Sequence, residues 1–147
     1  MDDTMLRMMR LAGKGYSCSQ IIILLGLEMR GENNPGLVRA MAGLAYGCGT
    51  ERGACGVLTG ACCLIALYAG KGDDEENESK HLLLMLEELT EWFETGTGCT
   101  RGETTCEAIV GDAGPAASRQ TCGALVADTY TRVMEILTTH GIDPTHA

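Results

Sequence analysis

The stretch from Gly53 to Gly70 runs for about 18 residues without a single charged side chain. A helix needs about 20 apolar residues to cross a bilayer, so this stretch lies at the lower limit. Small residues at Gly56, Thr59 and Gly60 interrupt it, and nothing else in the sequence provides a partner span. We therefore predict a buried central helix whose small residues let neighbouring helices approach closely.

Helical periodicity dominates the rest of the chain. Apolar residues recur at the offsets of one helix face between residues 80 and 95 and again between residues 125 and 137. Gly141 and Pro144 form a stop signal after the second of these helices. A short opening helix is expected around residues 6–10, and residues 21–27 are apolar all round. With no sustained strand alternation, these patterns predict an all-α helical bundle, a single domain spanning residues 1–147.

The charge balance excludes several classes of partner. The chain has 11 basic and 20 acidic residues and a net charge of −9. Binding to a phosphate backbone needs a basic face, so we expect no nucleic-acid partner, and an anionic membrane surface is equally disfavoured. The first five residues are acidic and lack the basic end and apolar run of a signal peptide, so we expect a cytoplasmic location.

The eight cysteines carry most of the functional information. In a reducing cytoplasm, clustered cysteines more often bind metal or perform redox chemistry than form structural disulfides. Four of them fall in the first turn of a predicted helix, where unpaired amides and the helix dipole stabilise a thiolate. Ser17 and Gln20 form a capping box at the first of these helix starts. The four residues are Cys18, Cys55, Cys106 and Cys122. If the helix starts converge, they form a four-thiolate pocket; if they do not, they are buried small hydrophobic residues.

The other cysteines are assigned lesser roles. Cys62 and Cys63 lie within the apolar segment and are interpreted as core packing. Cys48 lies in a glycine-flanked loop. The sequence is equally compatible with a Cys48 that faces the four-thiolate pocket and with one that faces away from it. Cys99 is expected to be an exposed loop thiol near the entrance of the site.

Charged residues near the cysteines have two interpretations. Arg52 and Arg101 each lie near a cysteine turn. They either lower a thiol pKa or pair with an anionic partner, or else they are simply exposed loop charges. The histidines, His81, His140 and His146, are all expected at the surface.

The segment from Gly53 to Ala61, which reads GACGVLTGA, resembles the signature of the C_GCAxxG_C_C family of redox-active proteins. The segments around the other three helix-start cysteines match the remaining cysteines of that family, and the resemblance runs from about Leu11 to Gly141. The central string reads A-C-G where the family name has G-C-A, and Cys48, Cys62, Cys63 and Cys99 are additional to the family pattern. The family also resembles the non-haem part of split-Soret cytochromes, in which a cysteine-ligated iron centre accompanies haem. No C-x-x-C-H haem attachment motif is present here, so only the thiolate centre carries over.

Three functions are compatible with these residues. The first is electron transfer through an iron–sulfur cluster held by the four helix-start cysteines, with Cys48 as a further candidate ligand and Gly53, Gly56 and Arg52 in support. The second is a thiol–disulfide redox protein without metal, and the third is a zinc-binding adaptor or accessory subunit. The first implies a redox partner protein and an oxidoreductase component rather than an independent enzyme, and the apolar central helix is compatible with a homodimer.

Overall fold

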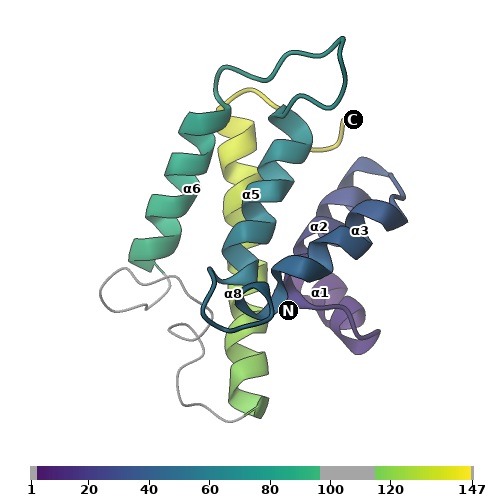
Figure 1. Ribbon diagram of the computed structural model, residues 1–147, viewed down its shortest axis with the longest axis vertical. Helices are drawn as coiled ribbons and strands as arrows, with labels where there is room; N and C mark the ends of the chain where they lie inside the picture. The colour runs from purple at the N-terminus through teal and green to yellow at the C-terminus, as the bar shows by residue number, and fades with distance from the viewer. Residues whose placement is uncertain (1–2, 97–114, 147) are drawn as a thin grey trace.

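The computed structural model describes residues 3–96 and 115–146, without the side chains of residues 96 and 115–121. All regular elements in this part of the chain are helical, which confirms the all-α prediction (Figure 1). They are α1 (Asp3–Gly13), α2 (Cys18–Arg30), α3 (Pro35–Met41), the 3₁₀ helix η1 (Ala42–Leu44), α4 (Ala45–Cys48), α5 (Gly56–Ala69), α6 (Leu82–Gly96) and α8 (Pro115–Thr139).

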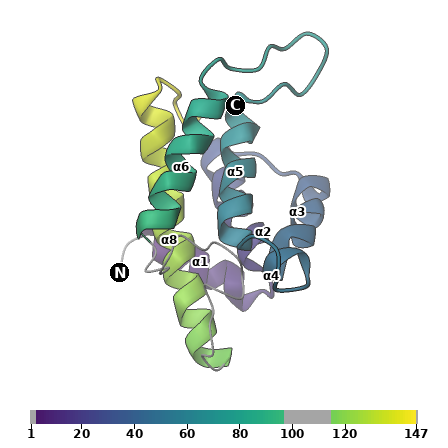
Figure 2. The ribbon, with the colours of Figure 1, turned by 60° about the vertical axis from the view of Figure 1, so that its left-hand side comes forward.

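Helix α5 is the centre of the bundle, as the charge-free segment predicts. It packs against α2, α6 and α8, and Val57, Leu64 and Ile65 are fully buried. Figure 2 shows α5 and α6 side by side, with α8 partly hidden behind α6 and α3 on the opposite side of α5 from α6. No helix in the described part of the chain is long and apolar enough to cross a membrane.

The α2–α5 crossing depends on glycine. A Cβ atom at Gly60 would lie 2.7 Å from Cγ2 of Ile22 and 3.2 Å from Cα of Ser19, closer than side chains normally approach. Gly26 on α2 is equally tight against Leu64 on α5. The buried Ser19 hydroxyl donates a hydrogen bond to the Met41 carbonyl at 2.7 Å and so ties α2 to α3. These contacts fix the position of the first turn of α2 relative to α5.

Two of the predicted helix boundaries are confirmed by the structure, and one is wrong. Helix α2 begins at Cys18, where the Ser17 amide donates to Oε1 of Gln20, one half of the predicted capping box. Helix α8 ends before Gly141, which adopts the left-handed conformation with φ 81°. Its start, however, lies at Pro115, so Cys122 is about two turns inside the helix rather than in its first turn.

Candidate thiolate site

Three of the four predicted cysteines lie together. Cys18 is the first residue of α2, Cys55 is the N-cap of α5, and Cys122 lies on α8. Cys55 and Cys122 are close enough to Cys18 for their negative charge to contribute to raising the pKa of its thiol. Cys55 is 3% exposed and the other two are half-buried. The fourth predicted member, Cys106, lies outside the described residues.

The sulfur of Cys18 lies between α2, α5 and the segment before α5. A Cβ atom at Gly56 would lie 3.0 Å from this sulfur and 2.9 Å from the Leu44 carbonyl oxygen, so glycine allows the close approach. The backbone amides of Ser19 and Tyr46 donate hydrogen bonds to the sulfur. Gly56 therefore lies against the sulfur of Cys18, and its supporting role at the site stays a prediction.

The expectation that a helix start lowers the thiol pKa is wrong for Cys18 in the metal-free protein. Burial, and then the charges of Cys55 and Cys122, raise its pKa to about 12. The amides of Ser19 and Tyr46 act in the opposite direction but do not outweigh burial. Removing water and grouping three sulfurs together therefore matter more here than the helix dipole.

The loop from residue 45 to residue 53 folds tightly beside this pocket. Tyr46, Cys48 and Glu51 adopt positive φ angles of 58°, 59° and 66°, which non-glycine residues rarely do. Gly53 closes the loop, because its amide donates to the Gly47 carbonyl at 3.1 Å and a Cβ atom there would lie 2.6 Å from that oxygen. Such strained residues persist only where their surroundings hold them, and here they place the Tyr46 amide against the sulfur of Cys18.

The remaining predicted residues occupy different environments. Cys48 is exposed, and a Cβ atom at Gly53 would lie 3.4 Å from its sulfur. Arg52 is exposed on the same loop, and its effect on a thiol pKa stays a prediction. Cys62 and Cys63 pack against the core on α5, as predicted, and burial and Cys63 raise the pKa of Cys62 to about 11. Cys99 and Arg101 lie outside the described residues.

The donor chemistry of the pocket fits a thiolate-bound metal centre. Sulfur ligands select iron–sulfur clusters or zinc, and amide donors to the sulfurs are typical surroundings of such centres. Among the described residues, no three histidine, cysteine or acidic side chains are already arranged to hold a metal ion. A complete four-cysteine ligand set would require Cys106 in addition.

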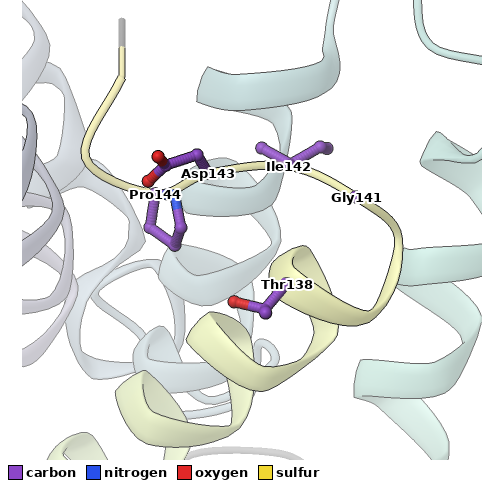
Figure 3. A pocket seen from close by; sticks show the side chains of 5 residues that line it. All are labelled: Thr138, Gly141, Ile142, Asp143 and Pro144. Atoms are coloured by element: carbon purple, nitrogen blue, oxygen red, sulfur yellow. The ribbon is translucent and has the colours of Figure 1, made fainter.

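An open depression of about 420 Å³ lies at the C-terminal end of α8, whereas Cys122 lies in the N-terminal half of that helix. It is formed by Thr138 at the end of α8 and by the turn that follows (Figure 3). The lining residues are Thr138, Gly141, Ile142, Asp143 and Pro144, none of which is a thiol or a strong nucleophile. The depression therefore offers no redox chemistry.

The expected surface position of the histidines is wrong for His140. Its side chain is only 11% exposed and contacts both Glu88 and His81. His146 is 78% exposed, as expected. The sequence contains no signal for this pairing, because residues 81 and 140 meet only through the packing of α6 against α8.

Comparison with known proteins gives one match. A family model described as Putative redox-active protein (C_GCAxxG_C_C) matches residues 16–136. The matched region contains all four predicted helix-start cysteines and most of the bundle. No curated protein and no solved structure matches the chain.

Proposed function

Because this chain belongs to the C_GCAxxG_C_C family of redox-active proteins, we propose that it transfers electrons through an iron–sulfur cluster bound by Cys18, Cys55, Cys106 and Cys122. The observation that carries the proposal is that Cys55 at the start of α5 and Cys122 on α8 lie close enough to Cys18 on α2 to contribute to raising its pKa, with Cys55 only 3% exposed. Family membership supports the redox role in general, and the sulfur pocket supports this particular form of it.

The burial of the pocket favours a metal centre over a free dithiol. An attacking thiolate is usually solvent-accessible and close to positive charge, whereas Cys55 is 3% exposed and burial raises the pKa of the Cys18 thiol to about 12. Three thiolates held together without water repel each other unless a positive charge lies among them. Metal binding supplies that charge and deprotonates the coordinating thiols outright.

Bound by Cys18, Cys55, Cys106 and Cys122, an iron–sulfur cluster would supply one-electron chemistry between a reduced and an oxidised partner protein. The chain positions the three described cysteines at the starts of α2 and α5 and on α8, and Gly56 allows the sulfur of Cys18 to approach the first turn of α5 closely. The amides of Ser19 and Tyr46 donate to the sulfur of Cys18 and so tune the reduction potential. Tyr46 is 64% exposed, so a partner protein that contacts this loop comes within one residue of the sulfur.

The test is an anaerobic preparation analysed for iron, acid-labile sulfide and visible absorption, followed by reconstitution with iron and sulfide. We expect stoichiometric iron and sulfide together with a broad charge-transfer band. Cys55→Ser should abolish retention of the cluster, whereas Cys63→Ser, on the same helix but packed against the core, should retain it. Circular dichroism of both variants separates loss of ligand from loss of fold.

Three outcomes would contradict the proposal. Equal retention in Cys55→Ser and Cys63→Ser would refute the ligand assignment. A colourless, iron-free protein after reconstitution that contains stoichiometric zinc would indicate a structural zinc site. A metal-free protein that gains two alkyl groups only after reduction would indicate a thiol–disulfide function.

A further inference from the structure

Two histidines meet at the end of the bundle where α6 begins and α8 ends (Figure 1). His81 directly precedes α6, and its carbonyl accepts the first hydrogen bond of that helix from Met85. His140 directly follows α8. Their Nδ1 atoms are 3.4 Å apart, and the rings meet edge to face with centroids 5.1 Å apart.

Glu88 determines which nitrogen of His140 is available. Its Oε1 atom lies 3.1 Å from Nε2 of His140, and the imidazole is 11% exposed. When Nε2–H donates to this carboxylate, the Nδ1 atom of neutral His140 carries a lone pair directed at His81. A carboxylate that accepts from the outer nitrogen of a histidine is the usual second partner of a metal-binding imidazole.

We propose that His81 and His140 bind a divalent transition-metal ion such as Zn²⁺ through their two Nδ1 atoms, with Glu88 orienting His140. Two imidazole nitrogens at about 2.0–2.1 Å from a tetrahedral zinc ion are about 3.3–3.4 Å apart, which matches the observed separation of 3.4 Å. On binding, His81 changes tautomer: the proton that its Nδ1 otherwise shares with His140 moves to its own Nε2 by exchange with water. Both imidazoles therefore stay neutral, each offers an Nδ1 lone pair to the ion, and water completes the coordination.

This site is separate from the sulfur pocket. Cys55 caps the start of α5, while His81 lies beyond its end, and α5 is about 20 Å long. A metal at the histidines would link the first turn of α6 to the last turn of α8, which the chain otherwise joins here through the Glu88–His140 contact. Binding to the native fold alone would then stabilise the bundle by mass action.

The test uses the full chain under reducing conditions and follows the ring nitrogens by NMR. Zn²⁺ is added until the thiols are saturated and then in further excess. The chain contains three histidines, so His146, at 78% exposed, serves as an internal control in the same spectrum. We expect the Nδ1 resonances of His81 and His140 to move together while those of His146 stay in place.

Variants distinguish zinc binding at the two histidines from zinc binding at the cysteines and from a simple hydrogen bond between the histidines. Glu88→Gln should weaken zinc binding by about 10–100-fold, while Glu87→Gln, at an exposed neighbouring position, should leave it unchanged. His81→Asn should remove the response of His140, and Cys55→Ser should preserve it even if the cluster is lost. Unmoved His81 and His140 rings would mean a hydrogen-bonded pair only, and equal movement of all three histidines would mean adventitious surface binding; either result overturns the proposal.

Discussion

Replacing Gly60 by alanine tests the α2–α5 crossing that positions the first turn of α2. The new methyl group would lie 2.7 Å from Cγ2 of Ile22, 3.2 Å from Cα of Ser19 and 3.3 Å from the Ser19 carbonyl oxygen. Overpacking of this kind costs about 1–3 kcal/mol, and two of the three contacts involve backbone that cannot rotate away. Alanine gains back at most about 1 kcal/mol in helix propensity. We therefore expect a net loss of about 1–2 kcal/mol in the free energy of unfolding.

For a chain of this length, that loss lowers the melting temperature by about 2–8 °C. The assay is thermal and urea unfolding of the metal-free protein under reducing conditions, followed by circular dichroism. Gly123→Ala on α8 is the matched control, because its methyl group would meet only the flexible end of Met8, at 3.3 Å, and should be neutral or stabilising. If Gly60→Ala proved as stable as Gly123→Ala, the reasoning about the crossing would be wrong.

Three further predictions concern the site and its supports. In the metal-free protein at pH 8, alkylation followed by mass spectrometry should modify exposed Cys48 before Cys18, because a Cys18 thiol with a pKa of about 12 is only about 1 part in 10,000 thiolate. Folding raises the Cys18 pKa from 9.0 to about 12. The free energy of unfolding, measured with urea, should therefore keep its full value below pH 9 and decline as the pH rises toward 12. A free energy of unfolding that does not change between pH 9 and pH 12 would contradict the raised pKa. Ser19→Ala leaves the Met41 carbonyl without its 2.7 Å donor and should cost about 1–3 kcal/mol in the same assay, whereas Asn34→Ala, which removes the α3 cap, should cost about 0.5–2 kcal/mol.

Apolar patterning was sufficient to predict the main helices but not their exact limits. The charge-free segment became α5 and the periodic segment after residue 80 became α6, because both patterns reflect burial directly. Helix α8 extends upstream to Pro115 through a polar stretch with no apolar stripe, so its start could not be inferred from periodicity. The short elements between residues 35 and 48 were not predicted, because they depend on a proline, an asparagine cap and left-handed residues rather than on a repeat.

The sequence indicated which cysteines lie close together better than it indicated their pKa values. The grouping of Cys18 with Cys55 and Cys122 follows from helix starts and the family resemblance, although Cys122 reaches the pocket from inside a helix. The raised pKa of Cys18 depends on burial and on sulfur–sulfur proximity, which no spacing reveals. The contact between His81 and His140 likewise arises from tertiary packing over 59 residues of sequence.

The placement of cysteines at one end of α5 and histidines at the other has a practical consequence for anyone who modifies this protein. Substitutions separated by about a helix length, with no partner in common, are expected to have additive effects on stability. If the proposed cluster is bound at Cys55, a reporter group or a surface tether attached near His146 should leave its reduction potential unchanged. The two ends of the bundle can therefore be modified independently of each other.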